Sequence, residues 1–287
     1  MSSYDYEKEP QGAGSFCGLK MDARTKHFLN AIKTFSCPKI LEVGAGQGRF
    51  LKKIARMRSD VCLYGVDISK TAIAAIRREN VLKGEFVVGD AQSLPFADNF
   101  FDVVVIMDVL EHLENPQKAV SEAERVLRPG GVFHFYVPCE RQLFTLNWFL
   151  RKTNFLNFRD FTKIHFGHIQ YFSHQDIKKI MSPYFSKISI AYSEHLVSQF
   201  LHFLILYIPK KLLSFFSKDI QRKMRSGYES SNNNEKVDAL ILILKNVWSF
   251  FIFPITIICE TEARLLSRFS FMAAGIHFTG FKDNEPS

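Results

Sequence analysis

The chain has few cysteines, and none of them are spaced as a recognised site. The five cysteines are scattered along 287 residues without a C-x-x-C pair, so neither a zinc site nor a disulfide framework is expected. The first residues are polar and lack the charged-then-apolar pattern of a secretory signal peptide. No internal repeat stands out. These absences favour a reducing, cytoplasmic setting.

Size and charge leave several classes of protein open. A chain of 287 residues can hold one large domain, or one domain with a sizeable insert, and can bury a real core. The net charge of +8 favours an acidic partner such as nucleic acid or anionic lipid, or is simply a solvated basic surface. Composition alone therefore does not choose between these alternatives.

The first half of the chain alternates between strand-like and helix-like segments. The run 101–107 is almost continuously apolar, as in a strand buried on both faces of a sheet. Such β-α alternation predicts a parallel, doubly wound sheet. We expect strands near 40–43, 61–66, 85–88, 101–107 and 132–137, with helices near 48–57, 70–80 and 116–127.

The pattern is less regular after Pro138. Residues 140–172 show no clear period, whereas Ser173 and Asp176 have the spacing of a capping box that opens a helix to about Met181. Residues 187–192 alternate like a strand, and 269–281 contain a candidate last strand.

A glycine-rich turn follows the first expected strand. Gly44, Gly46 and Gly48 stand at every second position, and helix-forming residues follow at once. Only glycine lets a ligand approach the backbone this closely at the start of a helix. Position 49, where a dinucleotide-binding turn has its third glycine, is Arg49, which disfavours a pyrophosphate ligand.

Two carboxylates follow the next two strands. Asp67 ends the second strand, about twenty residues after the turn, where a carboxylate can accept both hydroxyls of a ribose. Asp90 follows the third strand, where it can accept from an adenine amino group while apolar neighbours cover the ring. The turn and the two carboxylates together predict a nucleoside-containing cofactor.

Five motifs in this order resemble the class I S-adenosylmethionine-dependent methyltransferases. They are LEVGAGQG, YGVDIS, GDAQSLPFADNFFDVVV, MDVLEHL and LRPGGVFHFYVP, within residues 22–192. The resemblance implies a Rossmann-like, doubly wound, mostly parallel seven-stranded sheet and the cofactor S-adenosyl-L-methionine. In such enzymes the turn lies against the methionine part, Glu42 helps to hold its amino group, and Met107 lines the same end. The implied cofactor-binding set is Glu42, Gly44, Ala45, Gly46, Gly48, Asp67, Ile68, Asp90, Ala91 and Met107.

The candidate catalytic residue is His112. Methyl transfer needs the acceptor held in line with the bond that breaks, so positioning supplies much of the catalysis. A general base adds to it when the acceptor is a hydroxyl, and His112 follows the fourth strand, on the side where ligands bind. His165 and His168 fall in a segment that covers the acceptor in relatives, which makes them substrate candidates or ordinary loop histidines.

The stretch Asp108-Val-Leu-Glu-His112 is similar to one in ubiquinone-biosynthesis O-methyltransferases. There it is proposed to hold a divalent metal, so Asp108, Glu111 and His112 are alternative metal ligands. We expect no metal, because such residues also serve as pocket wall in many methyltransferases. The Asn/Asp-Pro-Pro-aromatic motif of DNA and amide methyltransferases is missing here, and no nucleic-acid partner is expected.

Residues 196–265 form a hydrophobic and basic insert that we expect to be helical. The apolar run 196–208 is short for a membrane span, and the longer run 239–258 contains Lys245, Asn246 and Pro254. The basic amphipathic stretch 209–225 between them is typical of a helix lying in an anionic interface. Monotopic attachment is favoured over a two-span hairpin, and an apolar cap over the active site or a dimer interface is the alternative.

The predicted organisation is a flexible segment over 1–21, a methyltransferase core over 22–195, the insert over 196–265, and a last strand with a tail over 266–287. The predicted function is methyl transfer to an oxygen of a lipophilic small molecule, a lipid or prenylated compound, by a protein at the cytoplasmic surface of a membrane. A methyltransferase for a soluble metabolite and a non-catalytic cofactor-binding membrane scaffold are the alternatives.

Overall fold

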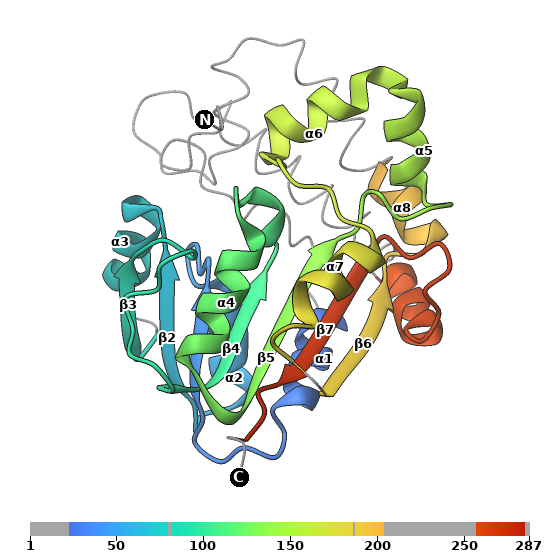
Figure 1. Ribbon diagram of the computed structural model, residues 1–287. Coiled ribbons are helices and arrows are strands. Elements are labelled where there is room, and N and C mark those ends of the chain that lie inside the picture. Colours follow the sequence, from blue (N-terminus) through green and yellow to red (C-terminus); the bar gives the residue numbers. More distant parts are fainter. Residues whose placement is uncertain (1–22, 80–81, 186, 204–256, 285–287) are drawn as a thin grey trace.

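A seven-stranded sheet in the order β3-β2-β1-β4-β5-β7-β6 organises the molecule (Figure 1). The first five strands run parallel, whereas β7 lies antiparallel between β5 and β6. The structure is a computed structural model that describes residues 23–79, 82–185, 187–203 and 257–284. The strands are β1 (Lys39–Val43), β2 (Cys62–Asp67), β3 (Gly84–Val88), β4 (Phe101–Met107), β5 (Leu127–Pro138), β6 (Lys187–Ser193) and β7 (Gly275–Phe281).

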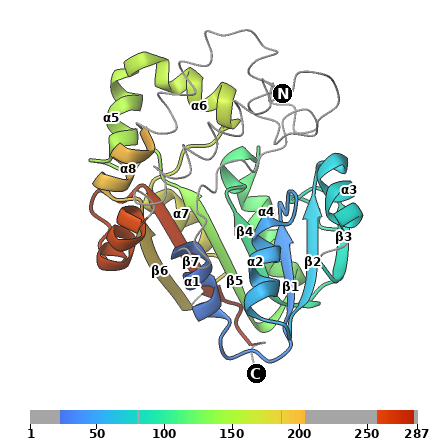
Figure 2. The same cartoon turned by 180° about the vertical axis from the view of Figure 1, so that it is seen from behind.

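Helices cover both faces of the sheet, as predicted for a doubly wound fold. Figure 1 shows α4 and α7 in front of the sheet, and Figure 2, seen from behind, shows α1 and α2 in front of it. The helices of these layers are α1 (Ala23–Ala31), α2 (Arg49–Met57), α3 (Lys70–Glu79), α4 (Pro116–Val126) and α7 (His174–Met181).

The central strand β4 is buried on both faces. Val104 and Ile106 belong to one core cluster, with residues of α4 and α7, while Val103 and Val105 belong to the other, with residues of α1, α2 and α3. Each such fully buried aliphatic side chain contributes about 1.5–3 kcal/mol relative to an exposed one. The apolar run in the sequence was therefore correctly interpreted as a strand between two layers.

Strand β5 begins five residues earlier than predicted. The Pro129-Gly130-Gly131 segment remains in the strand because the chain after β7 pairs with it: the Gly130 N–H donates to the Lys282 carbonyl, and the Lys282 N–H donates to the Gly131 carbonyl, each at 3.0 Å. The register with β4 shifts there, between Phe101 and Val103. This partner lies about 150 residues away in the chain, so local pattern could not reveal it.

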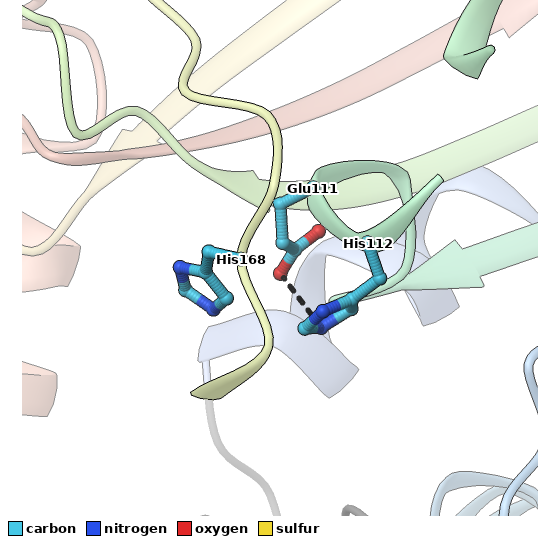
Figure 3. A group of neighbouring side chains, drawn as sticks. All are labelled: Glu111, His112 and His168. Carbon is cyan, nitrogen blue, oxygen red and sulfur yellow. Dashed lines mark ion pairs between the residues drawn. The ribbon is translucent and has the colours of Figure 1, made fainter. Parts of the chain in front are cut away.

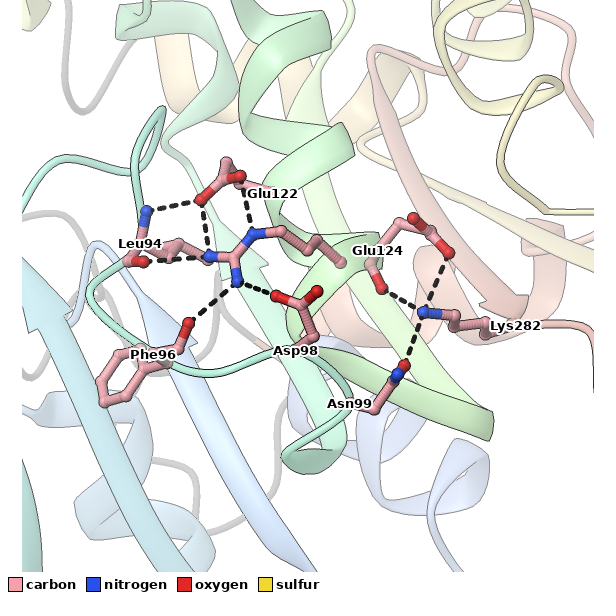
Figure 4. Close-up of polar contacts among 8 residues, drawn as sticks. Leu94, Phe96, Asp98, Asn99, Glu122, Glu124 and Lys282 are labelled. Carbon is pink, nitrogen blue, oxygen red and sulfur yellow. Dashed lines mark hydrogen bonds and ion pairs between the residues drawn. The ribbon is translucent and has the colours of Figure 1, made fainter.

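Polar contacts fix the loops at the end of the sheet where β4 and β5 begin (Figure 4). The Lys282 ammonium donates to the Asn99 side-chain oxygen at 3.0 Å and to the Glu124 carbonyl at 2.8 Å. Nearby, Arg125 forms two hydrogen bonds of 2.9 Å with the Glu122 carboxylate. These contacts lie near the amino ends of the parallel strands β4 and β5.

Residues 140–172, which have no clear period in sequence, contain two helices that we did not predict. They are α5 (Leu146–Thr153) and α6 (Phe158–Phe166), preceded and joined by turns that include η2 (Phe155–Asn157). Thr145 caps α5 by accepting from the Trp148 N–H, and Gly167 ends α6 in a left-handed conformation. Both helices lie above the carboxyl edge of the sheet (Figure 1).

The expected segment 1–21 lies outside the described residues, as does most of the insert 196–265. Its first part forms α8 (Leu196–His202), and its last part contains a helix over 257–266. Within the described ranges, no helix combines the length and apolarity needed to cross a membrane.

Candidate active site

The glycine turn after β1 has a backbone that requires glycine. Gly44, Gly46 and Gly48 have φ values of 76°, 50° and 70°, a region that other residues seldom occupy. A Cβ on Gly44 would stand 2.3 Å from Val109 Cγ2. The Gly44 and Ala45 N–H groups both donate to the Val66 carbonyl, at 2.8 and 3.0 Å.

Asp67 lies directly beside this turn. One carboxylate oxygen accepts from the Gly46 N–H at 2.7 Å, and the other accepts from the Ser69 N–H at 2.9 Å. The end of β2 therefore determines how the turn is oriented. Ile68, the next residue, is 60% exposed.

Glu42 on β1 offers a buried acceptor without a partner. Its side chain is only 4% exposed, and its Oε2 has no hydrogen-bond partner within the described part of the chain. Burial, reinforced by the nearby Asp67 charge, raises the pKa of Glu42 well above its usual value. An ammonium group placed here would supply both the missing donor and a counter-charge.

The other residues of the predicted cofactor-binding set also lie at the carboxyl ends of the parallel strands. Asp90 follows β3 and accepts from the Gln92 N–H at 2.8 Å, while Ala91 and Met107 are half-buried. All ten residues thus lie at the carboxyl ends of β1, β2, β3 and β4 or in the segments that follow them. The strand order reverses between β1 and β4, and ligands bind outside the carboxyl ends of strands at such a point. The residues fit S-adenosyl-L-methionine.

His112 lies in the 3-10 turn η1 (Leu110–His112), just after β4. Its Nδ1 is 3.1 Å from the Gly167 carbonyl; since a carbonyl only accepts, Nδ1 carries the proton and Nε2 the lone pair. Burial, followed by the charge of His168, lowers the pKa of His112 to about 3. His112 is therefore neutral near neutral pH.

His168 and Glu111 complete a compact group with His112 (Figure 3). The rings of His112 and His168 are 5.1 Å apart, and Glu111 Oε1 is 3.8 Å from His112 Nε2. His168 Nδ1 lies 2.6 Å from Glu140 Oε1; burial opposes protonation of His168, but Glu140 and Glu111 outweigh it and raise its pKa. Burial, then the Asp108 charge, raises the pKa of Glu111 to about 8.

The structure changes the set of alternative metal ligands. Glu111, His112 and His168 each place one ligand atom within 4.8 Å of the others, but Asp108 is not part of this group. Its carboxylate instead forms an ion pair with Arg24. The structure therefore brings Glu111 and His112 together with His168 and pairs Asp108 with Arg24, and a metal-binding role for these residues stays a prediction.

Of the two histidines predicted to contact substrate, the structure describes the side chain of His168 but not that of His165. His168 is next to His112, although the two are 56 residues apart, because the chain after α6 returns over η1: the Ile169 and Gln170 N–H groups both donate to the Glu111 carbonyl. The side chain of His165 lies outside the described part of the structure.

Sequence reasoning missed a charged network that adjoins the site. Arg24 on α1 lies 3.6 Å from the ring centroid of Tyr136 and 3.2 Å from Glu194, in addition to its pair with Asp108. Tyr136 also donates its hydroxyl to Glu194. These residues come from four segments far apart in the chain, namely α1, β5 and the residues just after β4 and β6, and no local motif marks them.

Residues 41–135 match the family model described as a methyltransferase domain. This part of the chain is a methyltransferase domain. Over 103 residues it is 34% identical to a demethylmenaquinone methyltransferase of Renibacterium salmoninarum, covering 36% of this chain and 42% of that protein. Over 96 residues it is 38% identical to a fatty-acid O-methyltransferase of Mycolicibacterium smegmatis, covering 33% of this chain and 35% of that protein. The matched region spans less than half the length of these relatives.

The fold of this methyltransferase domain also occurs in proteins named for other reactions. The crystal structure of the [4+2]-cyclase SpnF matches with a TM-score of 0.54 at 18% identity, over 90% of this chain and 79% of that one. This likeness confirms the predicted fold class. It also means that the reaction must be argued from the site rather than from the fold.

Proposed function

We propose that this protein transfers a methyl group from S-adenosyl-L-methionine to an oxygen of a lipophilic small molecule. The observation that carries the cofactor assignment is the buried Oε2 of Glu42, which has no partner in the described structure. Glu42 stands next to the glycine turn, where a Cβ on Gly44 would clash with the Val109 side chain. An ammonium-bearing ligand lying against the turn would supply the donor that Glu42 Oε2 lacks.

Each part of the site has a separate task in this proposal. Glu42 binds the amino group of the cofactor, and Asp67 binds the ribose hydroxyls while it holds the Gly46 N–H. Asp90 accepts from the adenine, with Ile68 and Ala91 against its ring. The bound cofactor supplies a methyl group already activated by its sulfonium charge.

His112 acts on the acceptor. Its Nε2 accepts a hydrogen bond from the acceptor hydroxyl and takes the proton as the new bond forms. Because the pKa of His112 is lowered to about 3, it is always in the basic form but is a weak base. Positioning therefore contributes more to the rate than proton removal does.

Two observations support a lipophilic acceptor. The similar proteins include a demethylmenaquinone methyltransferase and a fatty-acid O-methyltransferase. Large apolar side chains are also exposed on α5, on α8 and in the segment before β7; they include Phe149, Phe200, Phe269 and Phe271, each more than half exposed. Apolar surface of this kind marks interaction with a membrane or an apolar ligand, so we also propose peripheral or monotopic attachment.

A transfer assay tests the proposal. The protein is incubated with methyl-labelled S-adenosylmethionine and a membrane lipid extract in mild detergent, and the organic and aqueous phases are counted. We expect label in the organic phase, reduced about 10²–10⁴-fold by His112→Ala if His112 removes the proton. Label in the aqueous phase alone would replace the lipophilic acceptor with a soluble metabolite. Cofactor binding without transfer in either phase would indicate a non-catalytic scaffold.

A further inference from the structure

A cavity with a basic wall lies beside the candidate active site. It has a volume of about 730 Å³, and its lining residues come mainly from α5, α6, α7 and the segment after β5. We call it the basic pocket and define it by its five cationic residues. These are Arg141, Arg151, Lys152, Arg159 and Lys178.

The pocket holds much more positive than negative charge. Glu140 is the one carboxylate among its lining residues, and it is already shared: Oε2 lies 3.2 Å from Arg151, and Oε1 lies 2.6 Å from His168 Nδ1. Arg141 approaches Asp176 only to 3.9 Å. Four of the five cations are therefore not neutralised by a carboxylate in the wall.

The remaining cations make contacts that leave their charge in place. Arg159 donates Nε to the Arg151 carbonyl at 2.7 Å, and Lys152 lies 4.9 Å from the ring centroid of Trp148. Lys178 forms no ion pair within the described ranges. Like charges that line one cavity repel one another, and a bound anion offsets this repulsion.

We propose that the basic pocket binds an anionic group, a phosphate or a carboxylate. Guanidinium groups match the planar or tetrahedral oxygens of such anions, and lysines add point charges. Leu143 and Trp148 line the same pocket and provide apolar surface for a group attached to the anion. The anion is the headgroup of an amphiphile, or it is a free anion; the chemistry of the pocket is the same for both.

The pocket is linked to the active site through Glu140. This residue lines the pocket and also holds His168, whose ring lies next to His112. A headgroup bound here would leave the attached chain within reach of the site where we place the acceptor. Anion binding does not depend on the proposed methyl transfer, so an experiment can reject either proposal without rejecting the other.

Calorimetric titration of the full-length protein in a zwitterionic buffer tests the proposal, with inorganic phosphate and dodecyl phosphate below its micelle concentration as probes. We expect saturable binding of phosphate. Dodecyl phosphate binding at least about tenfold tighter identifies the pocket as a headgroup site, and equal affinities identify a free-anion site. Absence of saturable binding by both probes overturns the proposal.

A pair of double variants locates the binding. Lys152→Gln with Lys178→Gln removes two exposed pocket cations, and we expect at least about a tenfold loss of affinity for the probe that binds. Lys118→Gln with Lys187→Gln removes the same charge from exposed positions on α4 and β6 that do not line the pocket. This control should retain the affinity. Equal losses in both double variants would mean non-specific attraction and would overturn the assignment, and thermal unfolding checks that both variants fold.

Discussion

The carboxylate of Asp67 accepts a hydrogen bond from the Gly46 N–H at 2.7 Å, so the end of β2 fixes the turn that follows β1. Asp67 therefore has two roles in the proposed site: it contacts the cofactor ribose and holds the turn for the methionine part. Loss of its carboxylate should affect both halves of the cofactor at once.

We expect Asp67→Ala to weaken S-adenosylmethionine binding about 10–100-fold, the effect of losing one or two hydrogen bonds to a charged group. Calorimetric titration measures the affinity. Asp102→Ala is the matched control, because Asp102 also accepts from a backbone N–H, that of Lys39 at 2.7 Å, but at the opposite end of the strands. The control should lower the melting temperature and leave the affinity unchanged; equal loss of affinity in both variants would contradict a cofactor role for Asp67.

Gly44→Ala should abolish cofactor binding or unfold the protein, because the new Cβ would stand 2.3 Å from Val109 Cγ2. Gly130→Ala has the same backbone strain, since φ is 71° there and 76° at Gly44. Its Cβ meets only the Asn284 side chain, at 3.0 Å, so it should cost about 1–2 kcal/mol of stability. Thermal unfolding and calorimetric titration of both variants separate strain from steric blockage. If Gly44→Ala binds the cofactor normally, the turn is not the binding surface.

Glu140→Gln should lower the pKa of His168, because Glu140 is the carboxylate that forms a hydrogen bond with it. Titration of the histidine ring protons by NMR measures the pKa directly. Glu122→Gln removes a carboxylate that pairs with Arg125 far from the site and should leave the His168 titration unchanged. An unaltered His168 pKa in Glu140→Gln would mean that Glu111 and Asp108 alone determine it.

Acid should destabilise the protein through His134. This side chain is fully buried, and burial, reinforced by His27, lowers its pKa to about 3. The unfolded chain therefore binds the proton more tightly, so the stability is complete above about pH 6.5 and is lost as the pH falls. Between pH 6.5 and 5 this residue alone should cost about 2 kcal/mol, at roughly 1.4 kcal/mol per pH unit.

Denaturant unfolding at pH 7.5 and 5.0 measures this effect. In His134→Phe the difference in unfolding free energy between the two pH values should shrink by about 2 kcal/mol. Thr279→Val is the control: it removes the 2.9 Å hydrogen bond between Thr279 and His134 Nδ1 but keeps the titrating ring. An unchanged acid dependence in His134→Phe would assign the loss to another buried histidine such as His277.

Local sequence pattern was sufficient for most of the sheet and for the glycine turn after β1. The apolar run of β4 and the glycine turn after β1 are signals confined to a few neighbouring residues, and both predictions are confirmed as structure. The capping box at Ser173 and Asp176 likewise forms as predicted. The strand, the turn and the capping box depend on the backbone conformation and periodicity of a few neighbouring residues, so the local sequence is enough to predict them.

The parts that sequence did not predict depend on contacts across the chain. Arg24 meets Asp108 and Glu194 only after α1 has packed beside the sheet. Helices α5 and α6 carry apolar residues toward a small separate cluster around Leu150 and Phe158 rather than toward the main core, which weakens their periodic pattern. The ion pair of Asp108 could not be predicted for the same reason, because its partner Arg24 lies 84 residues earlier.

The antiparallel pairing of β6 with β7 sets Ser193 opposite Gly275. The chain therefore leaves the sheet and re-enters it at adjacent positions, and the sheet imposes no particular length on the residues between them. The entropic cost of closing such an excursion rises only slowly with its length. The stretch between these two strands can therefore differ in length without changing the sheet, whereas its two ends are tied together, because the Ala274 N–H donates to the Glu194 carbonyl at 3.0 Å.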